Sequence, residues 1–171
     1  YSAYDHVELF LNGQSLGRKS TGRDTQYTAT WQVPYRPGEL KAVGYQDSRV
    51  QSTWTLKTSG PAARLRLTTD RSTIKADGQD LSYVTVEVLD ARDICVPQAD
   101  HLIHFRVQGP GVLAGVGNGK PYGTESFQKP HRTVFQGRCL AILKSTRQAG
   151  VVTFTATAQS LAPDSVIIRT Q

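Results

Sequence analysis

The sequence has no methionine, only two cysteines among 171 residues, and no long apolar run. A membrane-spanning helix needs about 20 consecutive apolar residues, so none is predicted. Neither cysteine lies in a CxxC pair or beside a histidine at metal-ligand spacing. We expect Cys95 and Cys139 to be unpaired thiols, with Cys139 a small core residue. Without an initiating methionine, and with an abrupt start on Tyr1, the chain is expected to be a fragment of a longer protein.

The chain also lacks a concentrated patch of charge. Its net charge is +6 and its pI about 9.5, but no run of basic residues exceeds two. Nucleic-acid-binding proteins usually gather lysine and arginine on one stripe, interleaved with aromatic residues. Scattered charge is typical of an ordinary solvated surface, so neither nucleic acid nor a membrane is expected as a partner.

No helical period persists for two turns, and the dominant pattern alternates every two residues. The clearest example lies within residues 76–91. Val84, Val86 and Val88 share one face there, Thr85 and Glu87 the other, and an Asp-Gly turn precedes them. Short strands at regular spacing with turns between them predict an all-β protein of immunoglobulin-like sandwiches.

Two such sandwiches are expected in tandem. Residues 1–58 form the first, which is incomplete at its start; residues 59–62 form a linker; and residues 63–171 form the second. Asn12-Gly13 predicts a tight hairpin, because a type I′ turn needs positive φ at both central positions. The other strands of the first unit are predicted at residues 25–33, 39–45 and 50–57. Those of the second are predicted at residues 63–67, 84–88, 103–107, 112–116, 138–145, 151–158 and 165–170.

The sequence contains no recognisable catalytic constellation. A glycoside hydrolase needs paired carboxylates in a pocket, whereas the acidic residues here fall at turns or on outward strand positions. Asp77 and Asp80 precede the central strand while Asp90 and Asp93 follow it, which places the two pairs at opposite ends and argues against a calcium site. GxSxG and phosphate-loop motifs are absent, and the four histidines are dispersed. We predict no catalytic, metal or cofactor residue.

The longest irregular stretch, residues 117–136, is the best place for a ligand contact. It is rich in glycine, proline, lysine and aromatic residues, and long loops are often functional. Asn118 and Tyr122 are the candidate contacts, with Tyr122 able to stack on a sugar ring. Trp31 sits at an inward position of its alternation and is expected in the core, while the place of Trp54 is left open.

Several stretches together resemble the C-terminal immunoglobulin-like domains of bacterial glycoside hydrolase family 2 enzymes of the β-galactosidase type. The hairpin at residues 6–17 resembles a VELFLNGKSLG segment of that family, and residues 31–35 and 37–42 resemble the strand and turn that follow it. The second unit resembles a further C-terminal domain, which also has similarity to the repeats of bacterial adhesins such as invasin. The matching segments there are residues 76–78, 83–88, 90–91, 96–99, 115–119 and 135–138. Residues 92–95 depart from the family pattern.

The resemblance implies an architectural role in carbohydrate degradation. The family's catalytic glutamates belong to a (β/α)₈ barrel that this sequence cannot form, so the fragment alone is expected to be inactive. Its implied partner is the barrel of the same parent chain or a neighbouring subunit, in the periplasm or outside the cell. Two alternatives remain: a carbohydrate-binding module, and an adhesin-type spacer, which the dissimilarity of the two units disfavours.

Overall fold

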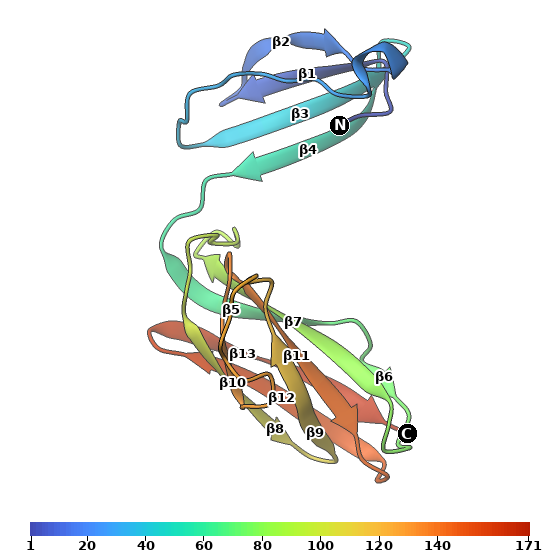
Figure 1. Ribbon diagram of the computed structural model, residues 1–171, viewed down its shortest axis with the longest axis vertical. Coiled ribbons are helices and arrows are strands. Elements are labelled where there is room, and N and C mark those ends of the chain that lie inside the picture. The colour runs from blue at the N-terminus through green and yellow to red at the C-terminus, as the bar shows by residue number, and fades with distance from the viewer. The chain divides into compact units, whose positions relative to one another are not determined.

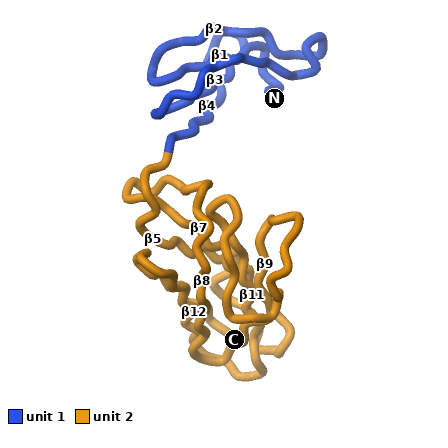
Figure 2. The backbone as a smooth tube through the Cα atoms, turned by 60° about the vertical axis from the view of Figure 1, so that its left-hand side comes forward, with its two compact units in different colours: residues 1–58 blue, residues 59–171 orange.

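The computed structural model describes residues 1–171, and it confirms the all-β class: thirteen strands and one short 3₁₀ turn, η1 (Arg23–Thr25). The chain divides into two compact units, Tyr1–Thr58 and Ser59–Gln171 (Figure 2). No helix is both long and apolar enough to cross a membrane.

Unit 1 is a single antiparallel sheet of four strands in the order β2-β1-β3-β4 (Figure 1). The predicted hairpin is confirmed: Asn12 and Gly13 have φ values of 51° and 82°. The Asn12 side chain also fastens the tip of this hairpin to the next turn, since it donates to the Pro37 carbonyl and accepts from the Glu39 amide at 2.7 Å. The strands are β1 (His6–Leu11), β2 (Gln14–Ser20), β3 (Glu39–Gln46) and β4 (Arg49–Lys57).

The strand predicted at residues 25–33 is wrong. The 3₁₀ turn η1 occupies its start, and Gln26 and Tyr27 follow with positive φ. Residues 29–33 keep the expected alternation, with Ala29, Trp31 and Val33 half-buried and Thr30 and Gln32 exposed between them. Their backbone, however, has no hydrogen-bonded partner strand. Alternating burial shows only which side chains are covered. A β-strand also needs backbone hydrogen bonds to a neighbouring strand. Unit 1 therefore has one sheet where a complete sandwich has two.

Unit 2 is a two-layered sandwich (Figure 1). One layer has the order β5-β7-β11-β9 and the other β10-β8-β12-β13, with the short β6 beside β13; a single parallel bridge between Arg64 and Ala162 joins the layers through β5 and β13. The first layer contains β5 (Ala62–Thr69), β7 (Leu81–Asp90), β9 (Gly111–Gly117) and β11 (Arg138–Ser145). The second contains β6 (Thr73–Ile74), β8 (Leu102–Gln108), β10 (His131–Thr133), β12 (Gly150–Ala158) and β13 (Leu161–Thr170).

The core of unit 2 lies between these layers, and the central strand behaves as predicted. Val84, Val86 and Val88 on β7 are completely buried, and they share one apolar cluster with Ile103 and Phe154 of the opposite layer. Burial of such aliphatic and aromatic side chains supplies most of the stabilisation of a sandwich.

The outward face of the same strand carries an ion-pair triad. Glu87 on β7 lies between Arg66 on β5 and Arg138 on β11, with N–O distances of 2.6 and 3.0 Å. Partial burial raises the pKa of the Glu87 carboxyl, but hydrogen bonds from the two guanidinium groups outweigh this effect and hold it below its usual value. The three strands are thus connected through one carboxylate as well as through their ladders.

Candidate ligand groove

The predicted loop, residues 117–136, proves partly regular. β10 lies inside it, and Phe135 and Arg138 then close a two-residue turn through mutual backbone hydrogen bonds of 2.8 and 3.1 Å. Gln136 and Gly137, at the centre of that turn, have φ values of 51° and 74°, as a type I′ turn requires. Gly137 is the only part of this turn with a sequence signal, because glutamine is not one of the residues that favour positive φ, and the turn was not predicted inside the longer irregular stretch.

The buried side chain of Arg132 on β10 connects separate parts of the loop. It is 1% exposed, and its guanidinium donates to the Glu125 carbonyl and to Asn118 Oδ1, each at 3.0 Å. The same group lies 4.8 Å from the centre of the Phe127 ring and 3.6 Å from the Glu125 carboxylate. A buried guanidinium needs this many partners to offset its lost hydration. Sequence reasoning gave Arg132 no role because its partners lie elsewhere in the loop.

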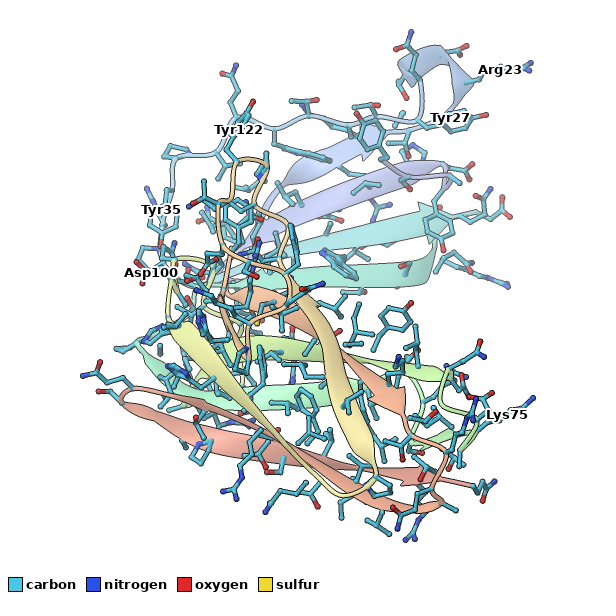
Figure 3. The ribbon with its side chains drawn as sticks, turned by 60° about the horizontal axis from the view of Figure 1, so that its bottom comes forward. Arg23, Tyr27, Tyr35, Lys75, Asp100 and Tyr122 are labelled. Atoms are coloured by element: carbon cyan, nitrogen blue, oxygen red, sulfur yellow. The ribbon has the colours of Figure 1, made fainter.

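The two predicted contact residues occupy different environments. Asn118 follows β9, donates to the Thr133 carbonyl at 2.7 Å, and accepts from both Arg132 and the Lys120 amide. Both lone pairs of its carbonyl oxygen are therefore engaged within the loop. Tyr122 lies at the far end of the loop and is 91% exposed (Figure 3). The structure does not bring the two side chains into one site.

A groove of about 530 Å³ lies at the base of the loop, on the outward face of the β7, β11 and β9 layer. The Phe135 ring and Leu140 give it apolar walls, Gly117 and Gly119 leave bare backbone, and Arg138 and Gln136 supply polar groups. The remaining lining residues are Thr85, Asn118 and Cys139. An aromatic wall beside amide and guanidinium donors is the kind of surface that a sugar ring can occupy.

The groove contains no pair of carboxylates. Every carboxyl group whose pKa is displaced has it lowered, whereas a general acid of a glycosidase needs a raised pKa. In Glu125, for example, a hydrogen bond from the Thr133 hydroxyl lowers the pKa more than burial raises it. The lining residues of the groove include no aspartate and no glutamate.

The aspartates around the central strand act as local structural groups. Asp77 accepts from the backbone amides of Gln79 and Asp80, which forms the turn before β7. Asp90 is 1% exposed and accepts from the amides of Gly60, Arg92 and Ile94 at 2.7–2.9 Å. These bonds, led by that of Gly60, lower its pKa to about 2. No three histidine, cysteine or acidic side chains are grouped closely enough to hold a metal ion.

The two cysteines and the two tryptophans lie beneath the groove or outside it. Both thiols are free; Cys139 is 4% exposed, and burial raises its pKa to about 12. Trp31 is half-buried rather than in a core, with Lys19 Nζ 5.2 Å from its ring centre. Trp54 on β4 is 71% exposed.

Residues 65–167 match the family described as glycoside hydrolase family 2 C-terminal domain 5, and residues 1–51 match a domain of unknown function, DUF4982. The beta-galactosidase BoGH2A of Bacteroides ovatus is 42% identical over 161 residues, covering 94% of this chain and 19% of that protein. A putative beta-glucuronidase of Formosa agariphila is 30% identical over 158 residues, covering 90% of this chain and 15% of that protein.

Among solved structures, a glycosyl hydrolase family 2 member from Bacteroides cellulosilyticus superposes with a TM-score of 0.95 at 38% identity. The match covers all of this chain and 22% of that one. The chain thus spans about a fifth of the length of these relatives. The two named enzymes differ in activity, one being called a beta-galactosidase and the other a putative beta-glucuronidase.

Proposed function

The chain belongs to glycoside hydrolase family 2, as part of its C-terminal region, and from this we propose that it is a non-catalytic accessory region of a β-galactosidase-like enzyme. The observation that carries the proposal is the similarity of nearly the whole chain to a small part of a named β-galactosidase. The lowered carboxylate pKa values support the non-catalytic part. We place the parent enzyme in the periplasm or outside the cell, by family likeness.

The role of this region is to pack against the catalytic barrel of the parent chain or against a neighbouring subunit. Support comes from apolar side chains that unit 1 leaves in solvent: Trp54 is 71% exposed and Leu56 is 56% exposed, side by side on one face of β4. Adjacent large apolar side chains on one sheet face are typical of a surface that a protein partner covers.

The test compares three proteins on a chromogenic galactoside: the parent enzyme, the parent lacking these 171 residues, and the 171-residue chain. We expect hydrolysis by the parent, none by the chain, and a lowered melting temperature in the truncated parent. Hydrolysis by the chain alone would refute the non-catalytic assignment. A truncated parent with unchanged melting temperature and activity would refute the packing role.

A second function, carbohydrate binding, is favoured by the groove beside Phe135. Calorimetric titration of the chain with galactosides and plant oligosaccharides should then show binding that Phe135→Ala abolishes. Tyr122→Ala tests whether the loop end takes part, and Val151→Ala, at an exposed position on β12, serves as a control. Absence of heat with every sugar would leave only the packing role.

A further inference from the structure

The Arg138 guanidinium is held at the groove with part of its hydrogen-bonding capacity unused. Its Nε and Nη2 both donate to Glu87 Oε1, each at 3.0 Å, which fixes the orientation of the group. Its other terminal nitrogen, Nη1, has no protein acceptor, and the side chain is 59% exposed. A guanidinium has five N–H donors in a rigid fork that fits a carboxylate. Arg138 is therefore oriented before a ligand arrives and still has donors to offer.

The charge around Arg138 stays positive after its ion pair is counted. The second oxygen of Glu87, Oε2, is taken by Arg66 at 2.6 Å, so two guanidinium groups share one carboxylate. Arg138 is also the only charged residue among those that line the groove. An anion in the groove would therefore be attracted by Arg138 and repelled by no acidic side chain of the lining.

The floor of the groove is open because one of its residues is glycine. Gly117 on β9 lies opposite Leu140 on β11, which lies opposite Thr85 on β7. The φ angle of Gly117 is outside the left-handed region, and nothing lies within 4 Å of its Cβ position. Neither backbone strain nor packing therefore requires glycine here. The Phe135 ring bounds the same space, with its Cδ1 atom 3.8 Å from the Cβ position of Gly119.

We infer that the groove binds a uronic acid residue of a carbohydrate, with the sugar ring on Phe135 and the carboxylate on Arg138. The inference rests on the carbohydrate binding proposed above and names the class of sugar. A pyranose has an apolar face that stacks on an aromatic ring, and a uronate adds a planar carboxylate that accepts two parallel N–H bonds from one guanidinium. The volume of about 530 Å³ lies within the roughly 300–1,000 Å³ range of small-molecule sites. The Thr85 and Gln136 side chains at the groove are available to the hydroxyl groups.

The test is calorimetric titration of the 171-residue chain with three methyl galactosides that differ only in the group at C6: the uronate, the neutral alcohol and the 6-sulfate. We expect the uronate to bind about tenfold or more tightly than the neutral sugar, because hydrogen bonds between two charged groups are stronger than those of a hydroxyl. Added salt should weaken binding of the uronate and leave that of the neutral sugar unchanged. Equal affinity for these two sugars, or tighter binding of the sulfate, would overturn the inference.

Variants assign the binding to this groove. Arg138→Gln should remove the preference for the uronate. Arg106→Gln is the matched control, because it changes the net charge equally at an exposed position on β8 in the other layer, and the preference should remain. Gly117→Val should abolish binding of all three sugars, since its side chain fills the floor without clashing with the protein. Equal losses in both arginine variants, or full binding in Gly117→Val, would overturn the inference.

Failure of this inference can be told apart from failure of the proposed functions. Equal binding of uronate and neutral sugar would overturn the inference and leave carbohydrate binding in place. Absence of heat with all three sugars would overturn both. The accessory role is judged separately, because it depends on the stability and activity of the truncated parent enzyme.

Discussion

At the scale of single residues, a few buried polar side chains bind segments that are far apart in sequence. The Asp90 carboxylate takes amides from Gly60, thirty residues before it, and from the turn that follows β7. Arg132 does the same for the two ends of the long loop. Each replaces the solvation lost on burial with several directed hydrogen bonds.

Asp90→Asn should make the chain less stable at neutral pH and flatten its acid sensitivity. The folded-state pKa of about 2 lies below the ordinary 3.8, so the ionised carboxylate stabilises the fold above about pH 4, and this contribution is lost as pH falls from 4 to 2. Melting temperatures from pH 2 to 7 measure it: wild type and variant should converge at the acid end. A constant difference across the range would contradict this account.

Arg132→Ala should lower the free energy of unfolding by about 3–5 kcal/mol, because it leaves Glu125 and Asn118 without their buried partner. Arg138→Ala is the control, since that guanidinium is 59% exposed and its ion pair contributes about 1 kcal/mol or less. Urea titration of both variants gives the comparison. Similar losses would show that Arg132 is not the anchor of the loop.

At the scale of elements, local signals decide some structures and distant partners decide others. The alternation in β7 and the Asn12-Gly13 turn were predictable, since side-chain period and positive φ act within a few residues. Residues 25–33 carry the same period without a ladder, because pairing depends on chain elsewhere. Asn118 was predicted as a ligand contact, yet its amide is engaged by Arg132 and Thr133, partners that spacing could not reveal.

The turn between Phe135 and Arg138 is expected to require glycine at position 137. A Cβ there would lie 2.4 Å from the Val96 carbonyl oxygen, at a φ of 74° that other residues resist. Gly137→Ala should cost about 2–4 kcal/mol of unfolding free energy. Gly117→Ala is the matched control, because nothing lies within 4 Å of its Cβ position. Equal stability of the two variants in urea would contradict the role of the turn.

At the scale of the whole chain, the two units differ in how much they bury. Unit 2 has a contiguous core of buried apolar side chains, whereas unit 1 has Val43 alone. Apolar burial scales with stabilisation, so unit 1 by itself is the weaker unit. Both tryptophans lie in unit 1 and both cysteines in unit 2, which lets each unit be followed separately.

The 171-residue chain should therefore unfold in two steps. Tryptophan fluorescence should change at lower urea than the exposure of the Cys139 thiol, which is 4% exposed when folded. The measurement uses Cys95→Ser, so that a thiol reagent reports Cys139 alone. Coincident midpoints would contradict independent unfolding of the two units.

The Arg66–Glu87–Arg138 triad also bears on how the sheet is assembled. Arg66 and Arg138 are each directly opposite Glu87 in their ladders. If either neighbour slipped by one residue, its arginine would turn toward the apolar core; a slip of two would separate the charges. A slipped register of β5 or β11 against β7 thus loses a favourable ion pair or buries a charged side chain. The triad therefore favours the correct strand register during folding.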